Sequence, residues 1–302
     1  MKKYNKLIFF TLMTVLVFTA YSCLKDEDGE KREKEKRLIE NYIQINNITT
    51  TPSSSGLYFI PVTEGTGATP GNTDYALIRY KSTDLNGTFY DGTDKALAEQ
   101  NKVNPIFALG GPLKIHMSVF YSGVTEALKQ MKEGGKAKLI MPSLLIYNDY
   151  VPRIVEVELL KVISNPKAYE QEQIATLLDT AYNNMPLSDS LSSGIYYIEK
   201  VAGTGIQPTG NKLVKMKYKG YLPDGRVFDT SEADTFKFRV GSGQVIIGLD
   251  EGVRQMKKGG KSTIIIPFYK GFGFNYVSSY GQIIIPYFST TVFDVELLDV
   301  TD

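Results

Sequence analysis

The chain has 302 residues, enough for about two domains, and its formal net charge is only +1. Acidic and basic residues are mixed along its whole length, so the charge pattern does not favour nucleic acid as a partner. Its one cysteine, Cys23, has no second cysteine with which to form an internal disulfide.

The first 22 residues are predicted to be an export signal. Lysines form a positive end, an apolar run covers residues 7–20, and small residues precede Cys23. The apolar run is short for a membrane span. Residues 20–23 resemble a loose bacterial lipobox, which implies lipid attachment at Cys23, and the alternative is an ordinary signal with a chance cysteine.

The residues after Cys23 bear on location. Residues 25–28, Lys-Asp-Glu-Asp, look like the acidic surface-export signal of Bacteroidetes lipoproteins, and the alternative is a solvated charge run. The chain is therefore predicted to be an outer-membrane lipoprotein that is held to the membrane through Cys23. Both the periplasmic and the cell-surface side stay open.

Two helices are predicted outside the domains. Residues 23–53 form a charged tether that continues into an amphipathic helix, and residues 164–190 form a helical linker that begins at Pro166. Their apolar faces comprise Leu38, Ile39, Tyr42 and Ile43 in the first helix, and Ile174, Leu177, Leu178, Ala181 and Tyr182 in the second. Because a free linker needs no apolar face, we expect the second helix to pack on a domain.

The remaining sequence contains the same unit twice. Three runs recur: residues 56–60 as 194–198, residues 158–160 as 296–298, and residues 131–136 as 256–261. The first two recur after 138 residues and the third after 125, so the first copy has 13 more residues before the third run and 13 fewer after it. The predicted domains are residues 54–163 and residues 191–302.

Periodicity predicts the elements of each copy. In the second copy Val214, Met216 and Tyr218 alternate with lysines, which indicates a strand with one buried face. Leu249 and Val253 belong to an apolar stripe that is typical of one short helix. Many strands and one helix predict an α+β fold, in which each domain is an antiparallel sheet wrapped around a short helix.

Several motifs of the second copy together resemble the FKBP-type peptidyl-prolyl cis-trans isomerases. They follow the family's order and spacing: Lys-Tyr-Lys-Gly at 217–220, Gly-Arg-Val-Phe-Asp at 225–229, Phe-Lys-Phe at 236–238, Gln-Val-Ile-Ile-Gly at 244–248 and Val-Phe-Asp-Val-Glu-Leu at 292–297. The resemblance covers about residues 194–300. It implies an antiparallel half-barrel around a short helix, with an apolar pocket for proline between helix and sheet.

The same resemblance assigns the residues of that pocket. It implies catalytic positions at Tyr218, Phe228, Asp229, Ile246 and Phe293, and substrate-binding positions at Phe236, Val245, Leu249, Phe272 and Ile285. Asp229 is the carboxylate beside the pocket, and the Ile246 N–H bonds the ligand carbonyl. Two positions depart from the family pattern, because Leu249 replaces the tryptophan of the pocket floor and Phe272 replaces a tyrosine. The lost hydroxyl removes one hydrogen bond to substrate, so weaker binding is expected.

The first copy is predicted to be a degenerate domain without useful isomerase activity. Its substitutions at pocket positions are Pro105 for Phe236, Tyr121 for Ile246 and Val155 for Phe293. Its 13 missing residues come from the loop that carries Phe272 and Ile285 in the second copy, so the lid of a pocket is absent. A binding, dimerisation or spacing role is expected.

The resemblance implies an isomerase that assists the folding of exported proteins. Proline-containing polypeptides are the implied clients, and macrolides are implied as further ligands. Rotation about an X–Pro bond requires neither metal nor cofactor, and a chain with one histidine and one cysteine has few residues to bind either. The alternative is a non-catalytic chaperone or scaffold lipoprotein that binds polypeptides through its FKBP-like domains.

Overall fold

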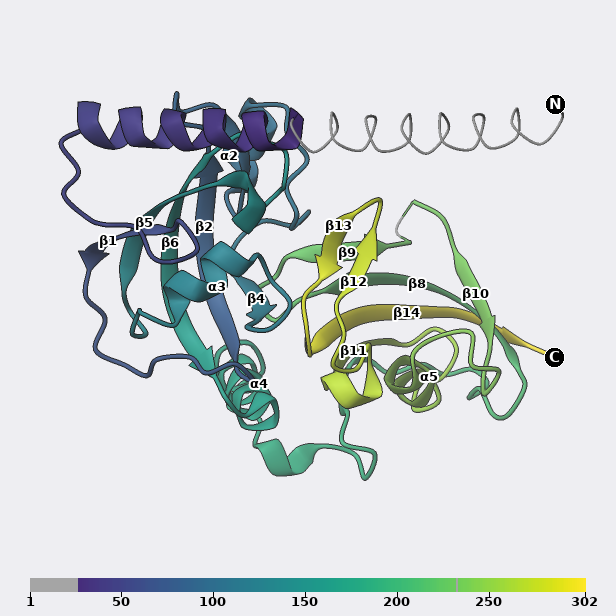
Figure 1. Ribbon diagram of the computed structural model, residues 1–302. Helices are drawn as coiled ribbons and strands as arrows, with labels where there is room; N and C mark the ends of the chain where they lie inside the picture. The colour runs from purple at the N-terminus through teal and green to yellow at the C-terminus, as the bar shows by residue number, and fades with distance from the viewer. Residues whose placement is uncertain (1–26, 232) are drawn as a thin grey trace, which may run out of the picture.

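The computed structural model describes residues 27–231 and 233–302. Cys23 and the predicted signal segment lie outside these residues. The part described contains two six-stranded antiparallel sheets, each with one short helix against it, which confirms the predicted α+β class (Figure 1). No helix in the described ranges is both long and apolar enough to cross a membrane.

The two sheets have the same strand order. The first runs β1-β5-β6-β2-β3 with β4 also paired to β2, and the second runs β7-β11-β14-β8-β10 with β9 also paired to β8. The first sheet comprises β1 (Tyr58–Thr63), β2 (Tyr75–Thr83), β3 (Phe89–Gly92), β4 (Leu113–His116), β5 (Lys136–Met141) and β6 (Arg153–Ile163). The second comprises β7 (Tyr196–Val201), β8 (Leu213–Tyr221), β9 (Val227–Thr230), β10 (Phe236–Arg239), β11 (Lys261–Ile266) and β14 (Thr291–Thr301).

The two copies differ in length at two loops. Between β3 and β4 the first copy has residues 93–112, here called the insertion, which contain α2 (Lys95–Gln100). Between β11 and β14 the second copy has a longer loop that contains the hairpin of β12 (Val277–Ser279) and β13 (Gln282–Ile285). The longer loop accounts for the second change of spacing. The insertion accounts for the first together with a shorter connection from β4 to α3 than from β10 to α5.

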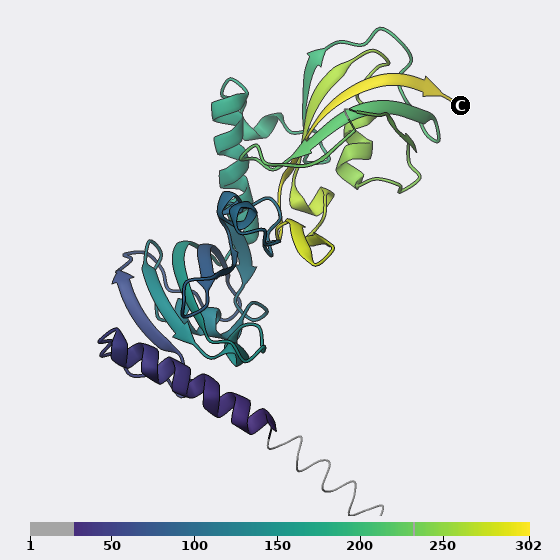
Figure 2. The same cartoon turned by 90° about the horizontal axis from the view of Figure 1, so that it is seen from above.

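A helix covers the outer face of each sheet. The N-terminal helix, described from residue 27 to residue 45, packs Ile39 on Ile140 and Ile154 of the first sheet. The linker helix α4 (Pro166–Ala181) packs on Ile265 and Val292 of the second. Figure 2 shows α4 beside the end of the second sheet that is nearer to the first domain. The linker is therefore part of the second domain's packing rather than a free connector.

Each of these helices also buries a glutamate that is bonded to the adjacent sheet. Glu35 accepts a hydrogen bond from the backbone N–H of Ser143, and Glu170 accepts one from the N–H of Phe268 at 2.6 Å. Glu35 and Glu170 lie 135 residues apart, which differs from the spacing of 138 residues between the first strands of the two copies. The packing face of the first helix contains Glu35 and, four residues later, Ile39. Leu38, expected on this face, lies outside it and is 44% exposed.

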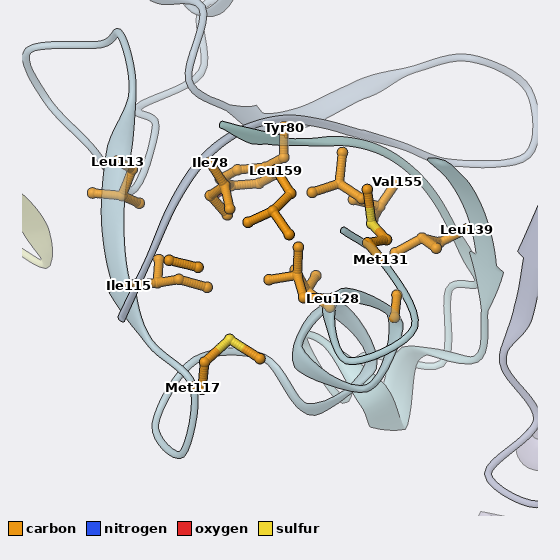
Figure 3. Close-up of a cluster of buried hydrophobic side chains, with 14 of the residues drawn as sticks. Ile78, Tyr80, Leu113, Ile115, Met117, Leu128, Met131, Leu139, Val155 and Leu159 are labelled. Atoms are coloured by element: carbon orange, nitrogen blue, oxygen red, sulfur yellow. The ribbon is translucent and has the colours of Figure 1, made fainter. Parts of the chain in front are cut away.

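The core of each domain lies between its sheet and its short helix, α3 (Ser122–Leu128) or α5 (Ile247–Val253). In the first domain Ile78, Leu128 and Val155 point toward one another from different elements (Figure 3). Full burial of such side chains contributes about 1.5–3 kcal/mol each, so the fold persists where pocket residues differ. Short 3-10 turns complete the elements at η1 (Ser143–Leu145), η2 (Leu187–Asp189) and η3 (Phe268–Lys270).

Candidate functional site

Four aromatic side chains of the second sheet meet in what we call the ring cluster: Tyr218 on β8, Phe228 on β9, Phe236 on β10 and Phe293 on β14. The ring centroids of Phe228 and Phe293 lie 5.6 Å apart, and those of Tyr218 lie 5.9 Å from Phe293 and 5.6 Å from Phe236. These spacings are typical of favourable aromatic pairs. The structure thus brings together four of the five predicted aromatic site residues.

Gly220 permits two of these rings to approach each other. A Cβ at this position would lie 2.7 Å from the Phe228 ring and 3.0 Å from the Phe293 ring, closer than such atoms can pack. The glycine that ends the Lys-Tyr-Lys-Gly motif is therefore required by the close approach of side chains. The first copy has the buried Ser82 at the equivalent place on β2, opposite Val155.

Apolar residues at the start of α5 pack against the ring cluster. Leu249 is 4% exposed, whereas Val245 and Ile246 are half-buried and precede the helix. Ile246 is the N-cap residue of α5, which places its backbone beside the same apolar surface. Leu249 thus packs in the same apolar cluster as the ring cluster, and its role as a pocket floor stays a prediction.

Asp229 is exposed at the edge of the ring cluster. The Tyr218 hydroxyl donates a hydrogen bond to Asp229 Oδ2 at 2.6 Å, and the Thr230 N–H donates to Asp229 Oδ1 at 2.9 Å. Burial, and then the bond to Asp229, raise the pKa of Tyr218 above its ordinary value, so the hydroxyl remains a donor at neutral pH. The pair fixes one carboxylate beside an apolar surface.

Phe272 and Ile285 both lie on the loop between β11 and β14. The Phe272 ring stands 6.3 Å from that of Phe228, beside the ring cluster. Ile285 is buried in an apolar cluster shared with the first domain, and Phe228 and Phe272 pack against the same cluster. The β12–β13 hairpin that carries Ile285 pairs with the insertion of the first copy.

The first copy contains the same Tyr–Asp pair, but it is buried. The Tyr80 hydroxyl donates to Asp91 Oδ2, and the Asp91 carboxylate also accepts from the N–H of Gly92 at 2.8 Å and from that of Ile106 at 2.9 Å. Asp91 is 6% exposed and Tyr80 is 4% exposed. Burial raises the pKa of Asp91 despite these donors. A carboxylate enclosed in this way cannot contact a polypeptide from solution.

The register of the first sheet corrects one alignment. Leu113, not Pro105, occupies the position of Phe236, because Leu113 faces Ile78 on β2 as Phe236 faces Met216 on β8. Pro105 lies within the insertion.

The 3-10 turn that follows β5 places Tyr147 at the position of Phe272, since both turns follow a proline and close with matching backbone hydrogen bonds. The missing residues therefore remove the hairpin but not this aromatic position. The shared prolines, Pro142 and Pro267, are the sequence signal that would have located Tyr147.

The described part of the chain offers apolar and hydrogen-bonding groups at this site rather than metal ligands. No set of three or more His, Cys, Asp or Glu side chains within residues 27–231 and 233–302 is placed to hold a metal ion. The site presents a set of packed aromatic rings with the Asp229 carboxylate at their edge and Val245 and Ile246 packed against them.

Comparison with known proteins finds, for the second copy, the same family that its sequence motifs resemble. Residues 204–298 match the model of the FKBP-type peptidyl-prolyl cis-trans isomerase family. The chain is 41% identical over 109 residues to "FK506-binding protein 4" of Dictyostelium discoideum, covering 36% of this chain and 29% of that protein. It is 39% identical over 116 residues to "Peptidyl-prolyl cis-trans isomerase FKBP16-3, chloroplastic" of Arabidopsis thaliana, covering 38% and 52%.

A third relative is known in both sequence and structure. The "FKBP-type peptidyl-prolyl cis-trans isomerase FkpA" of Escherichia coli is 41% identical over 111 residues, covering 36% of this chain and 38% of that protein. Its crystal structure matches with a TM-score of 0.37 and 34% identity over 45% of this chain and 62% of that one. The chain thus spans about half or less of the length of these curated relatives. The matched residues contain the whole ring cluster, so this segment of the chain is similar to the FKBP-type peptidyl-prolyl cis-trans isomerase family.

Proposed function

We propose that the C-terminal domain catalyses cis-trans isomerisation of X–Pro bonds in exported polypeptides. The observation that carries this proposal is the ring cluster with the exposed Asp229 at its edge, within a segment of the isomerase family. Proline-containing segments are the proposed substrates. Macrolide ligands, which the family binds, are proposed to compete for the same surface.

The proposed mechanism needs only differential binding. Rotation about an X–Pro bond breaks amide resonance, and the barrier is about 20 kcal/mol. The twisted amide has a less polarised carbonyl than the planar one, so an apolar surface stabilises it relative to the ground state. Phe228, Phe293 and Tyr218 would hold the proline ring, while the Ile246 N–H would bond the substrate carbonyl.

The location remains a proposal that rests on the N-terminal sequence. Residues 1–22, with Cys23 after them, support export followed by lipid attachment, and residues 25–28 support display at the cell surface. Replacement of Cys23 by serine is expected to move the protein from the membrane fraction to the soluble fraction. Unchanged membrane association of this variant would contradict the lipoprotein proposal.

A second candidate function is polypeptide binding without turnover. The loop after β11 exposes several aromatic side chains, including Phe274 at 55%, Tyr276 at 42% and Tyr280 at 101%. Exposed aromatic groups of this kind favour contact with unfolded chains. An isomerase assay distinguishes the candidates, because a pure binding module leaves the isomerisation rate unchanged.

The decisive experiment measures isomerisation of an X–Pro peptide by the full chain and by the variants Asp229→Ala and Asp299→Ala. Both aspartates accept a backbone N–H, but Asp299 pairs with Lys258, away from the ring cluster. Loss of a hydrogen bond to a charged group costs about 1.5–3 kcal/mol, so Asp229→Ala should lower kcat/KM by about tenfold or more.

The control should retain full activity, and a macrolide should inhibit the unaltered chain. Absence of activity in the unaltered chain, or equal activity of the two variants with native circular dichroism, would refute the proposal.

A further inference from the structure

The insertion of the first copy pairs with the hairpin of the second. The Ile283 N–H donates to the Ile106 carbonyl at 2.6 Å, and the Ala108 N–H donates to the Ile283 carbonyl at 3.0 Å. The Gln282 side chain donates from Nε2 to the Pro105 carbonyl at 2.8 Å. Figure 1 shows this hairpin between the two sheets. The hairpin, which only the second copy has, is thus hydrogen-bonded to the insertion, which only the first copy has.

The insertion also reaches the strand that carries two predicted site residues. Arg226 precedes β9, and its guanidinium donates to the Gly110 carbonyl while it lies 4.9 Å from the centroid of the Phe107 ring. Asp224 orients this guanidinium by accepting from Arg226 Nε at 2.8 Å. Residues two and three positions further along are Phe228 and Asp229. The contact therefore fixes the start of β9 from the other domain.

Apolar packing continues from this contact into the ring cluster. Phe107 of the insertion is fully buried in an apolar cluster that also contains Ile283 and Ile285 of the hairpin. Phe228 and Phe272 pack against that cluster, and Phe228 packs against the core of the second domain as well. Phe228 therefore connects the contact between domains to the ring cluster.

The buried Tyr–Asp pair supplies the other end of this connection. Asp91 Oδ1 accepts a hydrogen bond from the N–H of Ile106, and the carbonyl of Ile106 accepts one from the N–H of Ile283. One residue of the insertion, Ile106, is therefore bonded through its N–H to the first domain and through its carbonyl to the hairpin. In the first copy the aspartate supports a contact that extends to the second copy.

We propose that residues 105–110 of the first copy position the isomerase site of the second. They hold the start of β9 and the β12–β13 hairpin, and thereby set the placement of Phe228 and Phe272. Arg226 is the positioning residue at the centre of this contact. The inference rests on the proposed function, and it gives the inactive first copy a role in the activity of the second.

The test compares the full-length variants Arg226→Ala and Arg239→Ala. Each arginine donates from its guanidinium to a backbone carbonyl, Gly110 for Arg226 and Asn211 for Arg239, but Arg239 lies within the second domain. Arg226→Ala is expected to lower kcat/KM for an X–Pro peptide about fivefold to tenfold, chiefly by raising KM, and Arg226→Lys should restore part of the loss. Arg239→Ala should leave kcat/KM within twofold of the unaltered chain.

Amide hydrogen exchange supplies a readout that does not depend on turnover. Arg226→Ala and Gln282→Ala are each expected to increase exchange at residues 277–285 and 227–230, with unchanged exchange in β5 and β6. Increased exchange there with kcat/KM equal to that of Arg239→Ala would overturn the positioning role, and so would unchanged exchange in both variants. Inactivity of the unaltered chain would overturn the proposed function itself, which distinguishes the two failures.

Discussion

The two copies contain the same Tyr–Asp pair in opposite surroundings. Tyr218 and Asp229 lie at an exposed edge, whereas Tyr80 and Asp91 are enclosed by the insertion and by aromatic side chains such as Tyr121 and Tyr147. Burial, and then the nearby Asp91 carboxylate, raise the pKa of Tyr121 to about 12, as expected where water is largely excluded. The comparison teaches that the residue types alone do not define a site, since access decides whether a carboxylate contacts substrate or supports the fold.

The difference predicts that replacing the aspartate by alanine lowers the free energy of unfolding much more in the first copy than in the second. Asp91→Ala leaves the N–H groups of Gly92 and Ile106 without their acceptor, and each buried orphan costs about 1–3 kcal/mol. We expect a loss of about 3 kcal/mol in the free energy of unfolding of the first domain. Asp229→Ala, at an exposed position, should cost less than about 1 kcal/mol.

Urea unfolding of the full-length variants, followed by hydrogen exchange in each domain, measures both values. Exchange is needed because two domains need not unfold in a single transition. Equal destabilisation by the two substitutions would contradict the distinction between a supporting and an exposed aspartate.

A second pair of equivalent residues, both lysines, differs in burial between the two copies. Lys114 on β4 and Lys237 on β10 face equivalent positions, but Lys114 is half-buried at the junction of the domains and Lys237 is exposed. Lys114 donates to the Phe288 carbonyl at 3.3 Å. Burial lowers the pKa of Lys114 from 10.5 to about 7, opposed by Glu170 and Asp224 and assisted by Arg226.

This difference predicts a pH dependence with a definite sign. Between about pH 7 and pH 9 the unfolded chain holds the Lys114 proton and the folded chain releases it, so the free energy of unfolding rises with pH. Below pH 7 both states are charged and the rise is absent. The raised pKa of Glu170, caused by burial, acts in the opposite direction at lower pH.

The expected rise is about 2 kcal/mol over this range. Lys114→Met should abolish it, and Lys237→Met should retain it, as measured by chemical unfolding at a series of pH values. Retention of the full slope in Lys114→Met would assign the pH dependence to another group.

Local patterns account for what the sequence predicted. Alternation along β8 and the apolar stripe of α5 each depend on neighbouring residues, and the ring cluster follows from motifs that lie on separate strands. The pairing of Phe107 with Ile283 leaves no periodic trace, because it joins loops of different domains. The length of the same insertion also hides, in the sequence, that Leu113 pairs with β2 at the position of Phe236.

The smallest expected effect concerns the aromatic position that the copies share. Tyr147 places its hydroxyl 3.4 Å from Asp91 Oδ2, whereas Phe272 at the equivalent place has no hydroxyl to offer Asp229 or a substrate. Phe272→Tyr would supply this donor beside the Phe228 ring. One added hydrogen bond contributes about 1 kcal/mol, so kcat/KM should rise up to about fivefold.

Phe274→Tyr is the matched control, because Phe274 lies two residues further along the same loop, is 55% exposed and packs its ring 4.6 Å from Phe268 instead of Phe228. It adds the same hydroxyl without placing it near Asp229, so its kcat/KM should equal that of the unaltered chain. An equal gain in both variants would indicate a general effect of loop polarity, and a loss in Phe272→Tyr alone would mean that the hairpin holds this ring too tightly for the larger side chain. Only a gain confined to Phe272→Tyr supports the view that the second copy lacks a hydrogen-bond donor that the first copy still carries.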